Sequence, residues 1–383
     1  MKHSFLFAFL LVPMFAAAQT YTFSTLVSFP PASKHGPESP IGGLIIDSAG
    51  NLYGASYYGG THDACCGGDG TVFRVSPTGI LTVLHSFNAA AEDGAHPFAN
   101  VVRDSAGNIY STTLYGGGHQ QGTVFKITPS GQETILHSFA GGNDGNQPFN
   151  AVTVDSKGNV YGYVYLFING EQTGNGKIYK ITKSGAFSIA YDFSNGSGAN
   201  GADPVGSLIV GRDGNFYGAT EAGGSNTEVT AGVVFRFTPQ NQLTVLHVFP
   251  YNSSTDLEFP HGKLTQDNEG NMFGEAANGL DTSGIYKITQ SGDESVLSFC
   301  CSGSGSMVRD SQGNLYGVLD NRQVFSIYQV TPGGAVSTLY NFTSTQGNAV
   351  DGLAIDKQGN LYGLTGSGGA NGTGSVYKLT RHD

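Results

Sequence analysis

Tryptophan is absent from this 383-residue chain, and charged residues make up only 12% of it. A large core must therefore be built from its 24 phenylalanines and 19 tyrosines. After the first 18 residues, no apolar run approaches the ~20 residues that a membrane span requires, so we expect no membrane insertion. Basic residues are also scarce, with 18 Lys and Arg against 29 Asp and Glu. This balance argues against nucleic acid as a partner.

Only four cysteines are present, in the adjacent pairs Cys65-Cys66 and Cys300-Cys301. In an oxidising compartment we expect them to be paired as structural disulfides. Neighbours across a trans peptide lie about 3.8 Å apart, below the usual disulfide Cα separation of roughly 4.4 Å, so a vicinal bond would be strained. A bridge between the two pairs stays open, and so does a soft metal held with His62.

The N-terminus has the features of a secretory signal peptide. Lys2 precedes an apolar run over residues 5–15, and three alanines at 16–18 form a small-residue cleavage site before Gln19. We expect cleavage after about Ala18 and a secreted or periplasmic mature chain.

What the sequence has in abundance is repetition. The phrase Asp-Ser-Ala-Gly-Asn-Leu-Tyr-Gly at 47–54 recurs seven times, about 51.5 residues apart on average. Two more phrases follow it in fixed order, first seen as Val-Phe-Arg-Val at 72–75 and Thr-Val-Leu-His-Ser-Phe at 82–87. The last unit lacks the final phrase, which instead stands at the N-terminus, at residues 24–29.

Each unit consists of short β-branched and aromatic runs separated by Gly, Asn, Asp and Pro, which predicts four antiparallel strands. Such repeats are typical of propeller blades. We therefore predict an all-β fold, a seven-bladed β-propeller whose ring is closed by the N-terminal strand completing the last blade. Residues 1–18 form the signal peptide and 19–383 one domain, with blades at 41–87, 98–139, 149–193, 205–249, 261–300, 304–342 and 350–380 plus 22–29.

These phrases resemble the Gloeo-Verruco (GloVer) tandem repeats of secreted, choice-of-anchor bacterial proteins, from about Thr25 to Thr380. The resemblance is carried by Gly-Thr-Val-Phe-Lys-Ile-Thr-Pro-Ser-Gly at 122–131 and Leu-His-Ser-Phe at 136–139. It implies a secreted propeller-like array and no established catalytic residues. Because no anchor segment follows the last repeat, we expect a freely released protein. The Asp-x-x-Gly-Asn-x-Tyr phrase is more distantly similar to NHL, streptogramin-lyase and gluconolactonase-type propellers.

Aromatic rings at three positions of every repeat account for 21 of the 43 aromatics and predict a core between neighbouring blades. Ligand-stacking rings should instead be irregular ones, such as Tyr57, Tyr58, Tyr115, Phe167 or Phe259. His85, His137 and His247 share one outer-strand position in three blades, so they should not converge on one ion. The turn aspartates are interpreted as hairpin residues rather than calcium ligands.

Functional residues should break the repeat. The second-to-third-strand loops and the blade connections hold 16 of the 29 acidic residues, which predicts one strongly negative face. The residues before the proline of each blade should ring the mouth of the central channel. The candidate ligand-binding residues are Ser39, His96, Gln147, Asp203, Phe259 and Asn348, and the candidate metal ligands are Asp93, Asp144, Asp203 and Asp351.

No G-x-S-x-G, H-E-x-x-H or phosphate-loop motif occurs. The leading hypothesis is a secreted, non-catalytic binding scaffold that presents its acidic face to a neutral glycan, a protein or a cationic ligand. A glycan or protein is favoured over a small metabolite. The alternative is a metal-dependent hydrolase or lyase with one divalent cation, such as calcium, at the channel mouth.

Overall fold

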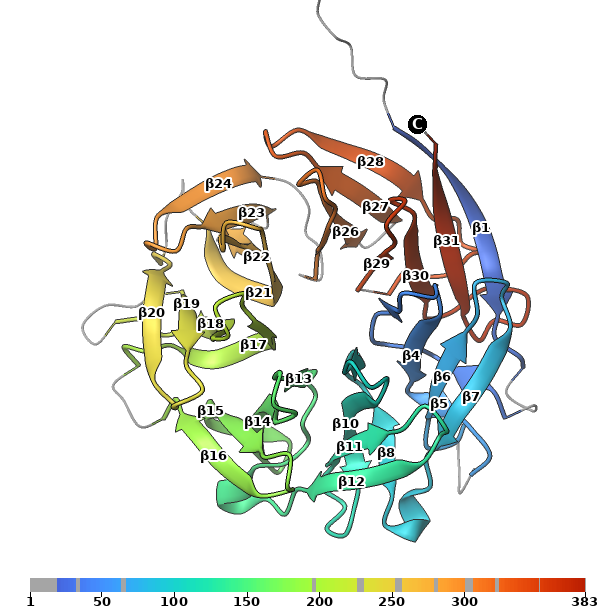
Figure 1. Cartoon of the computed structure of the whole chain (residues 1–383), viewed down its shortest axis with the longest axis horizontal. Coiled ribbons are helices and arrows are strands. Elements are labelled where there is room, and N and C mark those ends of the chain that lie inside the picture. The colour runs from blue at the N-terminus through green and yellow to red at the C-terminus, as the bar shows by residue number, and fades with distance from the viewer. Residues whose placement is uncertain are drawn as a thin grey trace, which may run out of the picture.

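A computed structural model describes residues 19–31, 35–62, 67–194, 198–225, 231–251, 257–278, 282–299, 306–320, 324–350 and 352–382. Seven β-sheets stand around a central channel like the blades of a propeller (Figure 1). Apart from two 3₁₀ turns, η2 (Ala89–Ala91) and η3 (Gly142–Asp144), the regular structure in these ranges is all β. The predicted seven-bladed propeller is confirmed.

The strands of the first four blades run outward from the channel in chain order. Blade 1 consists of β3 (Ile45–Ile46), β4 (Leu52–Ser56), β6 (Thr71–Val75) and β7 (Leu81–Ser86). Blade 2 consists of β9 (Val102–Arg103), β10 (Ile109–Gly116), β11 (Thr123–Ile127) and β12 (Glu133–Ser138). Blade 3 consists of β13 (Thr153–Val154), β14 (Val160–Ile168), β15 (Glu171–Ile181) and β16 (Phe187–Asp192). Blade 4 consists of β17 (Ala202–Val210), β18 (Phe216–Ala222), β19 (Val233–Phe237) and β20 (Leu243–Val248).

The remaining blades follow the same pattern. Blade 5 consists of β21 (Glu258–Gln266), β22 (Met272–Asn278), β23 (Thr282–Ile288) and β24 (Glu294–Phe299). Blade 6 consists of β25 (Val308–Arg309), β26 (Leu315–Asp320), β27 (Phe325–Val330) and β28 (Val336–Asn341). Two short strands extend the first blades: β2 (Pro37–Glu38) pairs with β5 (Tyr58–Gly59), and β8 (Gly94–Pro97) pairs with β10.

Blade 7 joins the two ends of the chain, as predicted. Its inner strands are β29 (Ala354–Ile355), β30 (Leu361–Thr365) and β31 (Ser375–His382). The outer strand is β1 (Thr20–Ser28), which runs antiparallel to β31 from Thr20 opposite His382 to Ser28 opposite Ser375 (Figure 1). The borrowed strand covers an edge that would otherwise be open to pairing with another chain.

An aspartate organises the first turn of each blade, at the repeated position in six blades and two residues later, as Asp213, in blade 4. In blade 2, Asp104 accepts hydrogen bonds from the backbone N–H and side-chain amide of Asn108 and from the hydroxyl of Tyr110, at 2.8–3.0 Å. Partial burial opposes ionisation, but these hydrogen bonds prevail and hold the pKa of Asp104 below its ordinary value. The structural interpretation of the phrase is thus confirmed.

The core lies between blades. The outer-strand phenylalanine of one blade meets the third-strand ring of the next, as in Phe87–Phe125, Phe139–Tyr179 and Phe249–Tyr286, with centroids 5.0–5.5 Å apart. Such edge-to-face contacts stabilise beyond the area they bury. One predicted core ring departs from this pattern, because Phe299 is 53% exposed.

The glycine that follows the second-strand aromatic is required by this packing. A Cβ atom added to Gly162, Gly274 or Gly363 would lie 2.2–2.4 Å from the hydroxyl of the third-strand tyrosine of the same blade. The missing side chain therefore allows the third-strand ring to cross the sheet at that point.

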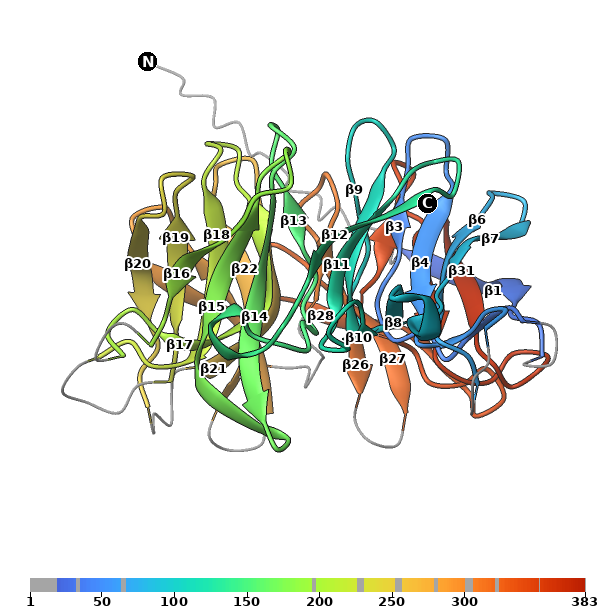
Figure 2. The ribbon, with the colours of Figure 1, turned by 90° about the horizontal axis from the view of Figure 1, so that it is seen from below.

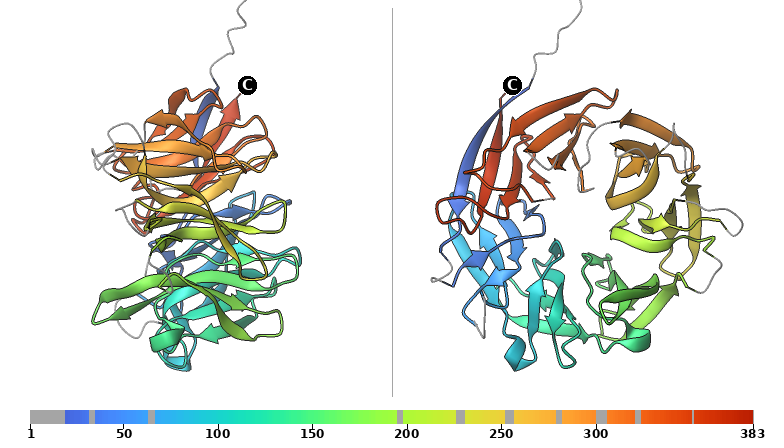
Figure 3. Two further views of the ribbon diagram at one scale, coloured as in Figure 1. Left: turned by 90° about the vertical axis from the view of Figure 1, so that its left-hand side faces the viewer. Right: turned by 180° about the vertical axis from the view of Figure 1, so that it is seen from behind.

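The two faces of the ring differ. One carries the tight turns between strands one and two and between strands three and four (Figure 2). The other, here termed the loop face, carries the second-to-third-strand connections and the links between blades, and the β14–β15 hairpin projects from it (Figures 2 and 3). Within the described ranges, no helix is long and apolar enough to cross a membrane.

Candidate functional site

Five predicted channel residues share an uncommon backbone conformation. Their φ angles lie between 49° and 57°, and the residues are Ser39, His96, Gln147, Asp203 and Phe259. Left-handed geometry is unfavourable for residues with side chains, and more so before proline. It is maintained by bonds between blades: the N–H of His96 donates to the carbonyl of Asp69, at 2.7 Å, and that of Phe259 to the carbonyl of Ala231, at 2.9 Å. The backbone N–H groups of His96 and Phe259 therefore link neighbouring blades.

Their side chains do not converge on one ligand. Asp203 lines a cavity at the channel mouth, whereas His96 stacks on Tyr57 with centroids 4.6 Å apart. Phe259 makes an edge-to-face contact with Tyr251, at 6.0 Å. The N–H of Asn348 faces Ser367 Oγ, at 3.4 Å. The two remaining residues, Ser39 and Gln147, do not line the cavity.

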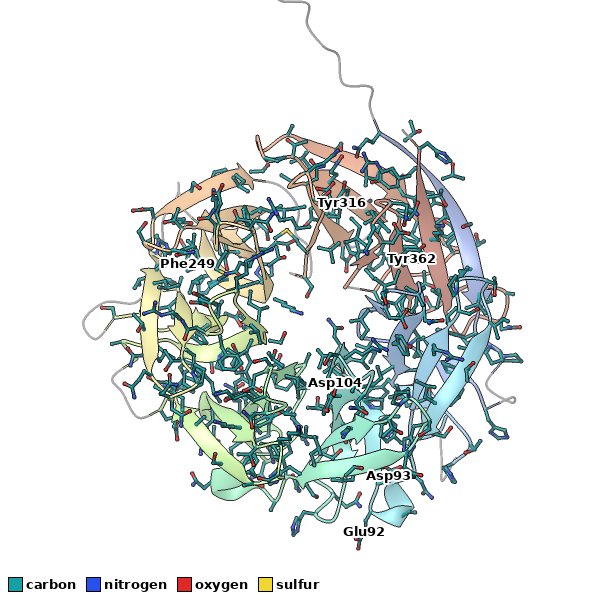
Figure 4. The ribbon with its side chains drawn as sticks, viewed as in Figure 1. Glu92, Asp93, Asp104, Phe249, Tyr316 and Tyr362 are labelled. Carbon is teal, nitrogen blue, oxygen red and sulfur yellow. The ribbon has the colours of Figure 1, made fainter. Side chains whose placement is uncertain are left out.

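The candidate metal ligands are also separated. Asp93 lies away from the centre of the ring (Figure 4) and faces His85, with Nε2 and Oδ2 2.9 Å apart. Asp144 occupies the matching place beside His137, at 3.1 Å. Neither lines the cavity that contains Asp203. Asp351 and the four cysteines lie outside the described residues.

The first blade seam brings three titratable groups together. Glu133, from blade 2, has its Oε2 3.9 Å from His85 Nε2. Burial and the neighbouring carboxylate of Asp93 raise the pKa of Glu133. At the second seam Phe187 takes the place of Glu133 and stacks on His137 at 3.7 Å. The three outer-strand histidines thus serve separate seams, as the sequence indicated.

A cavity of about 500 Å³ opens at the channel mouth. The residues that line it come mostly one to three positions after the prolines, rather than before them. Aromatic rings and side-chain amides share its wall: Phe98, Phe149, Tyr165, Asn100, Asn150 and Gln172. Its volume lies within the ~300–1,000 Å³ typical of ligand pockets.

Charged groups gather on the wall formed by blades 3 to 5. Gln172, from the projecting hairpin, donates to Asp203 Oδ1 at 2.5 Å, and burial raises the pKa of Asp203. Lys263 also lines the cavity, and burial lowers its pKa. Within the described part of the chain, Lys263 Nζ has no hydrogen bond or ion pair. The wall therefore offers both an acid and a base in environments that favour their neutral forms.

His261 is held from both sides. Its Nδ1 lies 3.2 Å from the carbonyl of Phe259, and its Nε2 lies 3.7 Å from Glu275 Oε2. Burial disfavours the charged imidazole, but the Glu275 carboxylate outweighs it and raises the pKa of His261. Glu275 is only 1% exposed and accepts a hydrogen bond from the hydroxyl of Tyr328. With both nitrogens facing acceptors, His261 is a positioned donor rather than a free base.

The Asn150 amide is a buried polar group in the cavity wall, beside the Tyr165 hydroxyl. Asn150 is 9% exposed, and within the described chain its Nδ2 forms no hydrogen bond of normal geometry. The neighbouring Tyr165 hydroxyl donates to the carbonyl of Pro204. Burial and the carboxylates of Asp203 and Glu221 raise the pKa of Tyr165, while the nearby Asn150 amide opposes the rise.

The family model of the Gloeobacter/Verrucomicrobia repeat matches residues 14–167 and 166–326. The chain belongs to this repeat family. No curated protein matches the sequence significantly. Among solved structures, a protein from Lactobacillus plantarum has 14% identity over 82% of this chain and 88% of its own, with a TM-score of 0.56.

Two further solved structures have TM-scores below one half. A gluconolactonase from Xanthomonas campestris is 13% identical over 94% of this chain and 90% of its own, with a TM-score of 0.47. The aldose sugar dehydrogenase from Streptomyces coelicolor is 15% identical over 95% and 99%, also at 0.47. These two likenesses carry no argument about this chain, and the likeness to the Lactobacillus plantarum protein shows the fold alone.

Three functional candidates of this repeat protein were missed from the sequence: Asn150, His261 and Lys263. The signal for them was available, since they follow the blade prolines at the first to third positions. Glu258 and Glu275 are among the 16 acidic residues expected on the loop face, but both are 1% exposed. A carboxylate placed in a loop by the repeat pattern can therefore still point inward.

Proposed function

We propose that this member of the repeat family is an exported binding protein whose channel-mouth cavity takes a neutral glycan. The observation that carries the proposal is the mixed wall of Phe98, Phe149 and Tyr165 rings with the amides of Asn100, Asn150 and Gln172. Sugar rings present apolar C–H faces and hydroxyl edges, and this wall complements both. Binding sites of this kind combine mostly apolar walls with a few placed polar groups.

The charge of the wall supports a neutral rather than an anionic glycan. Asp203 and Glu221 line the same cavity, and the loop-face acids surround it in the sequence-based interpretation. A sulfated or phosphorylated polymer would meet these two carboxylates there, beside the basic groups of His261 and Lys263. The Asn150 amide adds a polar group to the same wall.

The experiment that tests this function is a neutral-glycan array probed with the mature chain, residues 19–383. We expect binding of neutral oligosaccharides, with affinity reduced about tenfold by Asn150→Ala, because a buried hydrogen bond is lost. Asn200→Ala, at an exposed position in the connection between blades 3 and 4, is the control and should bind normally. An array without neutral-glycan signal contradicts the proposal.

Export and the metal-dependent alternative have their own tests. N-terminal sequencing of the secreted protein should begin at about Gln19. Elemental analysis of the purified chain, before and after chelation, tests for one bound divalent cation such as calcium. A stoichiometric ion together with shortened oligosaccharides after incubation would favour the hydrolase or lyase, with Asp203 as the first ligand to replace.

A further inference from the structure

We propose that Tyr57, Tyr58, His96, Phe98 and Tyr115 form an outer subsite, termed here the aromatic platform. On it lies the far part of an oligosaccharide whose near end occupies the channel-mouth cavity. The inference rests on the proposed function and adds a ligand class, a chain of neutral sugars rather than a single one. It also assigns a second binding surface outside the cavity.

The platform is one contiguous group from blades 1 and 2. The Tyr57 ring lies 4.7 Å from Tyr58 and 4.6 Å from His96, and the imidazole lies 5.9 Å from Tyr115. The imidazole is oriented by its own Nδ1 atom, which faces the backbone carbonyl of Tyr57 at 3.0 Å. A positioned imidazole at the centre therefore supports the surrounding phenol rings.

The rings are open to a ligand. Tyr58 and Phe98 are each 37% exposed, and Tyr115 is 40% exposed. Burial, and then the neighbouring phenol groups of Tyr115 and Tyr58, raise the pKa of Tyr57. Among the described residues, no hydrogen bond occupies the hydroxyls of these three tyrosines. Exposed faces and free hydroxyls side by side match the apolar faces and polar edges of sugar rings.

The platform and the cavity share one residue. Phe98 makes an edge-to-face contact with Tyr57, with centroids 6.3 Å apart, and also lines the cavity wall. A ligand that passes from one to the other meets rings first and then amides and carboxylates. A chain of sugars offers alternating apolar and hydroxyl surfaces over this whole path, which favours it over a folded protein partner.

The repeat itself shows that the platform tyrosines are not needed by the fold. Tyr58 and Tyr115 each precede a Gly-Gly pair, and at the same place in blades 4 and 7 the chain has Ala222 and Ser367. These turns form with small residues at that position, in strand β18 and two residues after the end of β30. Tyr58 and Tyr115 are therefore additions to the repeat, in contrast to the buried rings common to all blades.

The test is calorimetric titration of the mature chain with cello-, laminari- and manno-oligosaccharides of one to six sugars. Wild-type affinity should rise with chain length. The double variant Y58A/Y115S, whose new residues copy blades 4 and 7, should lose roughly tenfold affinity per ring for the longest bound oligosaccharide. Its affinity for the shortest bound sugar should stay within about twofold of wild type, since the cavity is intact.

Two controls separate stacking from other causes. Y58F/Y115F keeps both rings, so its affinity should stay within about threefold of wild type. This variant also keeps the test valid if Y58A/Y115S proves to be unstable. Tyr251→Ala removes a 51% exposed ring outside the platform and should bind normally. Equal affinity of wild type and Y58A/Y115S for every length overturns the platform while leaving the proposed function intact.

The other outcomes are equally decisive. If Y58A/Y115S loses affinity for short and long sugars by the same factor, the tyrosines support the cavity itself, and the proposal of a separate subsite is overturned. If the wild-type chain binds none of these sugars, and Asn150→Ala behaves as wild type does, the proposed function and the aromatic platform are both ruled out. Binding of extended peptides instead of sugars also overturns the proposal.

Discussion

The two faces of this ring are built from the same repeat but keep different amounts of it. On the turn face, an aspartate accepts hydrogen bonds from a nearby asparagine in all seven blades, from Asp47 to Asp356. On the loop face, the residue before the glycine pair is Tyr58, Tyr115, Ala222 or Ser367. The difference teaches that the repeated positions stabilise the ring, whereas the variable positions are free to bind.

The largest expected effect comes from comparing two copies of one repeated position, one buried and one exposed. Phe249→Ala removes a ring that is 0% exposed and packs on Tyr286, so we expect a loss of about 3–5 kcal/mol in unfolding free energy. Phe299→Ala alters the same repeat position where the ring is 53% exposed, and should cost less than about 1 kcal/mol. Denaturant unfolding of both variants makes the measurement. Equal losses would mean that Phe299 is buried in solution.

A smaller effect is expected at the repeated glycine. Gly162→Ala would place a Cβ 2.4 Å from the Tyr179 hydroxyl, which should destabilise the protein by about 1–3 kcal/mol. Gly118→Ala, whose nearest neighbour would be 4.0 Å away, is the matched control and should be nearly neutral. Thermal unfolding of the pair is sufficient. A neutral Gly162→Ala would show that the sheet can shift to accept the side chain.

The turn aspartate should contribute less, and with a characteristic pH dependence. Asp104→Ala removes three hydrogen bonds and should cost about 1–2 kcal/mol at pH 7. Because the folded pKa is lowered, this contribution is present above the ordinary carboxyl pKa of 3.8 and is lost as the pH falls below it. Urea unfolding should show the stabilities of the variant and wild type converging as the pH falls below this value. A constant difference at every pH would assign the loss to the turn backbone instead.

The smallest effect has the opposite sign. Because burial and Asp93 raise the folded pKa of Glu133, its neutral form is favoured and stability falls as the pH rises above the ordinary carboxyl range. At pH 8, the unfolding free energy of Glu133→Gln, measured in urea, should therefore exceed that of wild type by about 1 kcal/mol. At pH 5 the two should differ little. Phe187→Leu, at the equivalent seam, should show no such pH dependence. A variant less stable at pH 8 would indicate that the carboxylate has a cationic partner.

Much of the fold could be predicted because the same sequence pattern recurs in every repeat. Seven copies of one phrase revealed the hairpin turns, and the displaced phrase at 24–29 revealed that β1 closes the ring beside β31. Phe299 could not be separated from its six equivalents, since its exposure depends on the neighbouring blade. The seam contact between His85 and Glu133 joins positions 48 residues apart that the repeat alone does not pair.

The candidate site was predicted in place but not in composition. The residues before the blade prolines were identified as a set, and five of them share one backbone conformation. Their side chains diverge, however, because the left-handed geometry directs backbone groups across the seam. The cavity wall comes from residues one to three positions later, including His261 and Lys263.

By itself, the sequence determined the number of blades, their strands, the closure of the ring and the rings of the core, because local turn chemistry and period-two patterning repeat seven times. Only the tertiary structure decided which irregular residues meet: Asp93 with His85 at the rim, Tyr58 with Tyr115 around His96, and Asn150 beside Tyr165 in the cavity. The reason is physical. Repeated contacts lie within a blade or between identical faces, whereas a site in a propeller forms from single side chains of different blades, whose approach depends on the curvature of the whole ring.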